Sequence, residues 1–164
     1  VVLKGEGIAH KTEAGAVMLN LTSPQAVKDA ATRMSANRFL VEEMIDGTIA
    51  ELLIGVVRDP AHGFVLTLAA GGILTELLSD STSLLIPSTA DQVTAALHRL
   101  KIAKLLTGYR GKPAAAISAI VTAVMAVQDY VTQNAQGLAE VEINPLLCTQ
   151  TRAIAADALL RRKA

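Results

Sequence analysis

Three side chains near the carboxyl end of the chain have the types and spacing needed to bind a metal ion. Glu142 and Asn144 are two residues apart in AEVEINPLL, so in a strand they lie on one face. If this strand forms a hairpin with AIAADALL, turning near residues 150–151, Asn144 lies opposite Asp157, with Cβ atoms roughly 5 Å apart. Carboxylate and amide oxygens are the ligands that Mg²⁺ prefers, together with phosphates. The alternative is that Glu142 and Asp157 form only the solvent side of a hairpin.

Other residues could hold phosphate groups. Lys4 ends an apolar strand beside a glycine pair, where a lysine can reach phosphate oxygens. Arg58 ends a long strand and could clamp phosphate, and Gly71–Gly72 after FVLTLAA allows close approach of the backbone to an anion. Each of these signals also has a simpler interpretation, as a solvated strand end or a turn.

Two acids and three histidines complete the set of candidates. The pair Glu42–Glu43 puts acids on both faces of the strand FLVEEMI, so one of them should face inward or towards a cleft. His10, in GIAHKTEAGAV, could act in chemistry or only cap a turn, whereas His62 lies in a turn and His98 on a short helix. The sequence contains no zinc spacing, Gly-x-Ser-x-Gly, P-loop or dinucleotide motif.

Strands and helices alternate along the chain that must position these residues. Ser23 and Pro24 begin a helix over 23–34, Thr89 caps a helix over 90–100, and Pro113 lies near the start of the longest helix. That helix is expected over 112–134. Strands are expected over 1–4, 16–21, 39–45, 49–59, 64–70, 139–147 and 153–160, with shorter ones at 73–78 and 83–86. Strand pairs joined by tight turns and interleaved with helices indicate an α+β fold with a mostly antiparallel sheet.

The composition limits the class of protein. The 164 residues suffice for one domain, and 51% are apolar with no Trp, so the core is made of Ala, Val, Ile and Leu. Fifteen basic residues balance fifteen acidic ones, which argues against nucleic acid or an anionic membrane as the main partner. A single cysteine, Cys148, excludes an internal disulfide and suits a reducing cytoplasm.

Neither a membrane segment nor a signal peptide is expected. The longest mostly apolar run, at 114–127, is too short to span a bilayer, and VVLKGEG lacks a basic start and a cleavage pattern. The first residue is not Met and lies inside an expected strand, so we expect a piece of a longer polypeptide.

An ordered set of motifs resembles the nucleotide-binding domain of the NDP-forming acyl-CoA synthetases. These motifs are VVLK, HKTEAGAV, VEEMI, ELLIGVVRDP, AAGGILTE, GYRGKP, EVEINPLL and AADALL. The family includes the ADP-forming acetyl-CoA synthetases and, more distantly, the succinyl-CoA ligase β subunit. The resemblance spans residues 1–164 and implies an ATP-grasp fold that lacks an N-terminal portion.

The resemblance also implies roles for individual residues with ATP or ADP and Mg²⁺. Lys4 matches the strand lysine that holds ATP phosphates, and Glu51 and Arg58 fall in a motif lining the phosphate side of the cleft, near Gly71–Gly72. The hinge segment, where adenine is read by backbone groups and an acid nearby binds the nucleotide, comprises Glu42, Glu43, Met44 and Ile45. The Mg²⁺ ligands would be Asn144 and Asp157, with Glu142 adjacent.

The resemblance gives His10 a place in a phosphate relay. In the ADP-forming acetyl-CoA synthetases a phosphoryl group leaves an acyl phosphate, passes through histidine and reaches ADP. Neutral imidazole is a nucleophile near pH 7, and Lys11 would offset the phosphoryl charge. The alternative is a loop histidine that only hydrogen-bonds the nucleotide or the turn. The implied partners are CoA-binding and phosphohistidine domains, with a carboxylic acid and CoA as substrates of the whole enzyme; a homo-oligomer is left open. The piece alone is expected not to turn over.

The sequence departs from the family pattern at three positions, and two alternative functions remain beside the leading one. The second glycine expected after HKTE is Ala16, Leu84 stands where many members have arginine, and Ala69 stands where glycine is common. The last two departures indicate altered phosphate handling beside Gly71–Gly72 or a branch that uses a different acid. A separate alternative is that the chain is a ligand-sensing module of a protein acetyltransferase, although the presence of His10 argues against it. It could also be another ATP-grasp ligase, joining a carboxylate to an amine.

Overall fold

Two antiparallel sheets organise the chain, one in each of two units, Val1–Asp46 and Gly47–Ala164. The computed structural model describes residues 1–8, 11, 14–72 and 79–163. His10 and the short strand expected at 73–78 lie outside these residues. No helix in the described stretches is long and apolar enough to cross a bilayer.

The first unit is a three-stranded sheet with one helix. Strand β1 (Val2–Gly5) lies between β2 (Val17–Met18) and β3 (Phe39–Glu42), and α1 (Pro24–Arg33) packs on the sheet. Ser23 caps α1 as predicted, because its hydroxyl oxygen accepts a hydrogen bond from the amide of Ala26 at 3.1 Å. Its core is apolar and consists of Leu3, Ala16, Ala30 and Met34.

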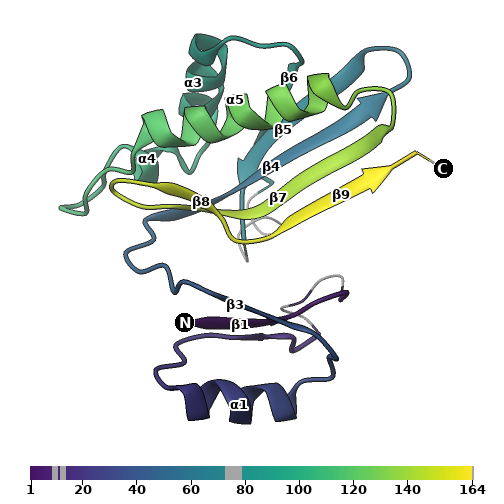
Figure 1. Ribbon diagram of the computed structural model, residues 1–164. Coiled ribbons are helices and arrows are strands. Elements are labelled where there is room, and N and C mark those ends of the chain that lie inside the picture. The colour runs from purple at the N-terminus through teal and green to yellow at the C-terminus, as the bar shows by residue number, and fades with distance from the viewer. Residues whose placement is uncertain (9–10, 12–13, 73–78, 164) are drawn as a thin grey trace. The chain divides into compact units, whose positions relative to one another are not determined.

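The second unit is a larger antiparallel sheet with helices on one face (Figure 1). Its strand order is β6–β5–β4–β7–β8, and β9 also pairs with β7. The strands are β4 (Ala50–Asp59), β5 (Gly63–Ala70), β6 (Ser81–Leu85), β7 (Leu138–Cys148), β8 (Ala153–Ala155) and β9 (Ala158–Arg162). The helices are α3 (Ala90–Arg99), α4 (Ala103–Leu106) and α5 (Ile117–Gln133). Because side chains alternate along a strand, Leu52, Ile54 and Val56 of β4 face α3 and α5 and are buried in one core. Glu51, Leu53 and Gly55 therefore lie on the other face.

Two predicted elements are shorter than expected, because tertiary partners decide their ends. The strand expected to run to Ile45 ends at Glu42, whose partner Val2 is the first residue of β1. The longest helix starts at Ile117 and not at Lys112. The amides of Ala115 and Ala116 donate to the carbonyl oxygens of Leu106 (2.9 Å) and Thr149 (3.0 Å) instead of entering a helix.

Two further strands are shorter or interrupted. The strand expected over 16–21 is regular only at Val17–Met18, and Asn20 has a φ of 59° that a strand cannot contain. The strand expected over 153–160 breaks into β8 and β9 at Ala156–Asp157. The partner strand β7 bulges at the same level, so regular pairing is interrupted there.

Candidate functional site

The turn Gly71–Gly72 packs directly on the first residues of β4. The amide of Gly71 donates to the carbonyl oxygen of Glu51 at 2.8 Å. A Cβ on Gly71 would lie 2.6 Å from the carbonyl carbon of Leu52, and a Cβ on Gly72 would overlap the Glu51 carboxylate. Gly72 also has a φ of +60°, a conformation that favours glycine. Gly71 is therefore required by the close approach of the Leu52 backbone, and Gly72 by its left-handed conformation beside the Glu51 carboxylate. The predicted approach of an anion to this pair stays a prediction.

A bulge in β7 brings Asn144 to this turn. Leu52 pairs with Leu146 and Ile54 with Ile143, so Asn144 and Pro145 both lie opposite Leu53. The side-chain oxygen of Asn144 accepts a hydrogen bond from the Gly72 amide at 3.3 Å. Residues 51, 72 and 144 are far apart in sequence but meet at one end of the β4–β7 pair.

The predicted hairpin has the predicted register. Ile143 pairs with Ala158 and Leu146 with Ala155, which puts Asn144 opposite Asp157. The Asn144 amide donates to the carbonyl oxygen of Asp157 at 3.3 Å. One carboxylate oxygen of Asp157, Oδ1, accepts a hydrogen bond from the Ala158 amide at 3.0 Å. Glu142 pairs with Gly55 and Leu159, on the face that does not carry the core.

The donor set at this end fits a hard cation that arrives with a phosphorylated ligand. Among the described residues no three His, Cys, Asp or Glu side chains are grouped to hold a metal ion by themselves. Two carboxylates and one amide oxygen, from Glu142, Asp157 and Asn144, are a smaller set. Mg²⁺ uses such sets, because it keeps several waters and takes one or two carboxylates in addition to substrate phosphates.

The first unit contains the other described residues that the sequence predicts for the site. Lys4 is buried, and its ammonium group forms an ion pair with the Glu42 carboxylate across the β1–β3 pair. Glu43 is exposed beyond the end of β3, so the alternation argument does not apply to it. Met44 and Ile45 follow without regular structure and are half-buried. Lys11 is half-buried in a turn, where its carbonyl oxygen accepts the Ala16 amide at 2.7 Å.

Arg58 does not join the cluster around Glu51, contrary to the expectation that both line one surface. The two residues are seven positions apart on β4, which is roughly 23 Å in a strand and an odd number of residues, so they lie on opposite faces. The Arg58 guanidinium donates to the carbonyl oxygen of Ala135 at 2.9 Å and lies 5.4 Å from the ring centroid of Phe64. Arg58 thus holds the loop after α5.

Asp80, which was not among the predicted residues, connects the end of β5 to the residues between α3 and α4. Asp80 is buried, and its two carboxylate oxygens accept the amides of Lys101 at 2.7 Å and Ile102 at 2.8 Å. Its carbonyl oxygen accepts the Ala70 amide at 3.0 Å. The signal for Asp80 in the sequence is weak: it is an acid directly before the short strand STSLL.

Cys148 lies beneath the same end of the sheet. It pairs with Ala50 and is buried, and burial together with the Glu51 carboxylate raises the pKa of its thiol to about 12. The thiol is therefore protonated at neutral pH, and Cys148 is a packing residue and not a nucleophile.

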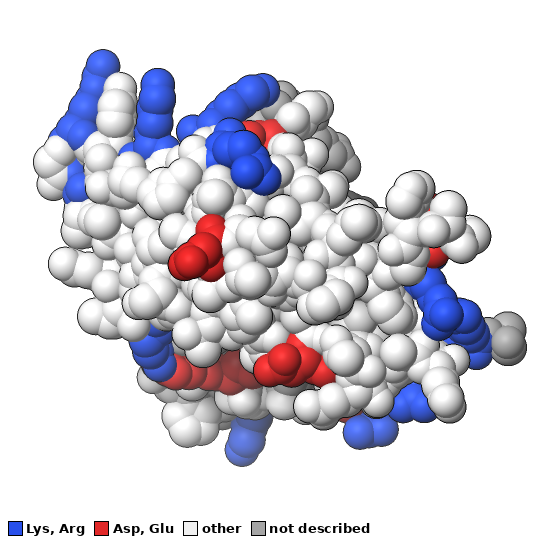
Figure 2. Space-filling model, turned by 90° about the horizontal axis from the view of Figure 1, so that it is seen from above, with Lys and Arg blue, Asp and Glu red and all other residues white. Residues whose placement is uncertain are grey.

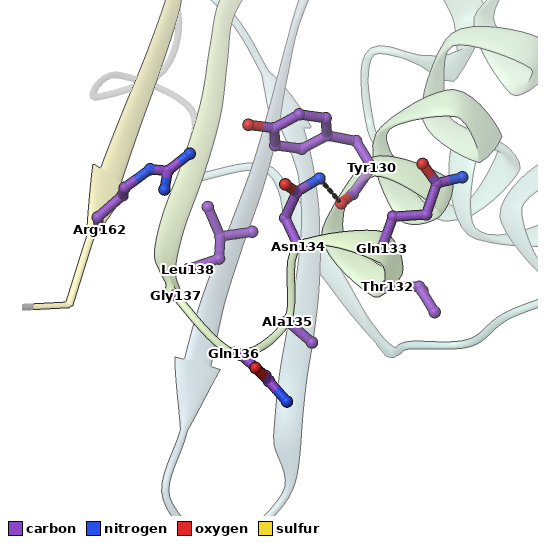
Figure 3. A pocket seen from close by; sticks show the side chains of 9 residues that line it. All are labelled: Tyr130, Thr132, Gln133, Asn134, Ala135, Gln136, Gly137, Leu138 and Arg162. Carbon is purple, nitrogen blue, oxygen red and sulfur yellow. Dashed lines mark hydrogen bonds between the residues drawn. The ribbon is translucent and has the colours of Figure 1, made fainter.

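An open depression of about 410 Å³ lies at the other end of the sheet (Figure 3). It begins at Leu138, six residues before Asn144 on β7, and it contains amide and hydroxyl groups but no carboxylate. Its lining residues are Tyr130, Thr132, Gln133, Asn134, Ala135, Gln136, Gly137, Leu138 and Arg162. None of the predicted site residues that the structure describes lines it.

The sequence matches the family model described as ATP-grasp domain over residues 1–161. The chain belongs to the ATP-grasp family. This ATP-grasp domain is 32% identical, over 85% of its length, to an ADP-forming acetate–CoA ligase of Methanocaldococcus jannaschii, of which it spans 21%. It is 31% identical, again over 85% of its length, to the β subunit of ADP-forming acetate–CoA ligase II of Pyrococcus furiosus, of which it spans 63%.

A solved structure has the same fold. The ATP-grasp domain superposes with a TM-score of 0.86 on a Ca. Korarchaeum cryptofilum acetyl-coenzyme A synthetase in complex with coenzyme A and Mg-AMPPCP. The sequences are 27% identical, and the match covers 99% of this chain and 76% of that one. All three proteins are CoA ligases or synthetases, so the alternative of a ligand-sensing module is not favoured. The predicted α+β ATP-grasp fold is confirmed.

Proposed function

We propose that this chain is the nucleotide-binding domain of an acid–thiol ligase. The whole enzyme would convert a carboxylic acid, CoA and ATP to acyl-CoA, ADP and phosphate. The observation that carries this proposal is the meeting of Glu51, Gly72 and Asn144 with the Asn144–Asp157 pair at one end of the β4–β7 ladder. The similarity to acetate–CoA ligases supports the reaction class.

Residues of the second unit would hold Mg²⁺ with the nucleotide phosphates. Asn144 and Asp157 supply the protein oxygens, and Glu142 lies on the same face one pleat away. The ion would neutralise charge on the phosphate oxygens and hold them in one orientation. Gly71 and Gly72 would lie beside the phosphates, since the Asn144 side-chain oxygen accepts a hydrogen bond from the Gly72 amide.

Residues of the first unit would bind the rest of the nucleotide. The Lys4 ammonium group would contact phosphate oxygens, and the nearby Glu42 carboxylate fixes the position of Lys4 beforehand. The segment Glu42–Ile45 would read the adenine through backbone groups. Glu51 would orient the phosphate side, whereas Arg58 is left out of the proposal, because it holds a distant loop.

His10 and Lys11 would carry the phosphoryl relay. A neutral imidazole nitrogen would attack the γ-phosphorus of ATP, forming an N–P bond as the bond to the ADP oxygen breaks. The phosphoryl group would then pass to the phosphohistidine segment of the enzyme and on to the acid. Lys11 would offset the transferred negative charge.

The partners of the domain would be parts of the same enzyme. A CoA-binding domain and a phosphohistidine segment would complete the site, in the same chain or in a partner subunit. Residues 1–164 would form the ATP-grasp domain of that longer enzyme, which would work in the cytoplasm.

The nucleotide proposal is tested by titrating the chain with a fluorescent mant-ATP, with Mg²⁺ or with EDTA. We expect Mg²⁺-dependent binding that Asp157→Asn weakens at least ten-fold. Asp129→Asn is the matched control, since Asp129 is an exposed acid of the same unit on α5. Equal affinities for the wild type and Asp157→Asn would contradict the metal assignment.

The relay is tested in the complete enzyme with γ-³²P-ATP and Mg²⁺. We expect acid-labile, base-stable label that is lost in His10→Ala and kept in His98→Ala, an exposed histidine on α3. Label that persists in His10→Ala would leave the ligase in place but remove His10 from the relay. Nucleotide binding without any label would overturn the ligase assignment.

A further inference from the structure

A strongly basic surface covers the end of α3, the short helix α4 and the loop that follows. Residues 99–112 contain five Lys or Arg and no Asp or Glu, although the whole chain carries fifteen of each charge. All five side chains belong to exposed residues, which are Arg99, Lys101, Lys104, Arg110 and Lys112. Figure 2 shows Lys and Arg side chains projecting towards the left of the view, the side on which α4 and this loop lie in Figure 1. We call residues 99–112 the basic surface.

The loop of the basic surface has an unusual backbone that presents two large side chains. Gly108, Arg110 and Gly111 have φ values of 90°, 49° and 79°. The left-handed conformation is costly for a residue with a Cβ, and Arg110 adopts it nevertheless. Its guanidinium lies 5.3 Å from the ring centroid of Tyr109, which is 45% exposed. The loop therefore holds an exposed aromatic ring and an exposed guanidinium together at its tip.

Internal hydrogen bonds fix the base of this loop. The Lys112 amide donates to the carbonyl oxygen of Tyr109 at 3.0 Å, and the Ala115 amide donates to that of Leu106 at 2.9 Å. Before α4, the Asp80 carboxylate accepts the amides of Lys101 and Ile102. A surface that is ordered in advance loses less entropy when it binds a partner.

We propose that the basic surface binds an acidic segment of another polypeptide. The charges come from three successive elements, so they spread over more surface than one phosphate group covers. Tyr and Arg are the residue types that contribute most at protein interfaces, and the tip presents one of each. Five positive side chains in a stretch that contains no Asp or Glu attract an acidic partner and orient its approach. This inference does not depend on the proposed nucleotide function.

The first experiment measures binding of a fluorescein-labelled 20-residue polyglutamate peptide to the chain by anisotropy. We expect binding at 50 mM NaCl that weakens strongly at 300 mM. The double variant Lys104→Glu/Arg110→Glu should weaken it at least ten-fold. Lys28→Glu, which reverses an exposed charge on α1, should change it less than two-fold.

Other results would overturn the proposal. These are the absence of peptide binding, an equal effect of Lys28→Glu, and displacement of the peptide by equimolar free CoA, which would indicate a small-molecule site. Tighter binding of duplex DNA or phosphatidylserine vesicles than of the peptide, lost in the same double variant, would assign the surface to a nucleic acid or a membrane.

A second variant separates binding from folding. Arg110→Gly removes the side chain and suits the backbone conformation, so the melting temperature should be unchanged or higher. Peptide affinity should nevertheless fall at least three-fold, and Arg110→Lys should keep part of it. An Arg110→Gly variant that binds as tightly as the wild type would contradict a role for the tip.

Discussion

The two ends of the β4–β7 ladder differ in how their backbones meet. At one end, Gly71–Gly72 presses on Glu51 and Leu52, and Asn144 reaches across from a bulge. At the other end, Arg58 and Gly137 lie beside an open depression, and a Cβ on Gly137 would touch nothing within 4 Å. This depression is therefore not where the described candidate residues lie. We call the end at Gly71–Gly72 the crowded end and the end at Gly137 the open end. Side chains from distant segments meet at the crowded end, as expected of a functional site, whereas the open end is a gap between loops.

Gly71→Ala should have the largest effect on folding. Its Cβ would lie 2.6 Å from the carbonyl carbon of Leu52, and backbone cannot move aside without breaking the ladder. We expect the free energy of unfolding to fall by about 3 kcal/mol or more, measured by urea denaturation. Gly137→Ala, at the open end, should change it by less than about 0.5 kcal/mol. Similar losses in both variants would remove the contrast between the ends.

Gly72→Ala should damage binding more than folding. The left-handed φ costs about 1–2 kcal/mol for alanine, and the new methyl group displaces the flexible Glu51 carboxylate and not a rigid backbone. Mg²⁺-dependent mant-ATP affinity should fall about ten-fold while a folded domain remains. Unchanged affinity would mean that the position of Glu51 does not matter to the ligand.

Alkaline pH should lower the free energy of unfolding, because the thiol of Cys148 at the crowded end loses its proton. The pKa of its thiol is raised to about 12 in the fold, from an ordinary value of about 9, so the folded chain keeps a proton that the unfolded chain releases. This stabilisation is complete below about pH 9 and is lost as the pH rises towards 12. Between about pH 9 and 12 the wild type should lose roughly 1.4 kcal/mol per pH unit relative to Cys148→Ala. Parallel pH profiles of unfolding free energy for the two proteins would contradict this.

Arg58→Ala, at the open end, should have the smallest effect. It removes one hydrogen bond to Ala135 and one contact with the Phe64 ring, so we expect the unfolding free energy to fall by about 1 kcal/mol. Nucleotide affinity should stay within two-fold of the wild type. A ten-fold loss of affinity would return Arg58 to the phosphate site.

Local patterns predicted much of this molecule. The apolar runs predicted strands β4 and β5, and the capping residues Ser23 and Thr89 predicted helices α1 and α3. A hairpin with an uninterrupted register predicted that Asn144 lies opposite Asp157. Glu51 and Arg58, which one motif groups together, lie near opposite ends of β4, and their odd spacing on one strand places them on opposite faces.

Other features depend on distant partners. The late start of α5 requires the carbonyl oxygens of Leu106 and Thr149, and the role of Asp80 requires amides some twenty residues away. The meeting of Gly72 with Asn144 requires the order of strands in the sheet. No local window of sequence contains this information.

The buried thiol of Cys148 can report how often the sheet opens. A thiol reagent can reach this sulfur only while β7 is out of place, because the residue lies between Ala50 of β4 and Ala153 of β8. The rate of labelling under native conditions therefore counts how often the centre of the sheet opens. A ligand that binds across Glu51 and Asn144 would slow this labelling, so its binding could be followed at a residue that the chain already contains.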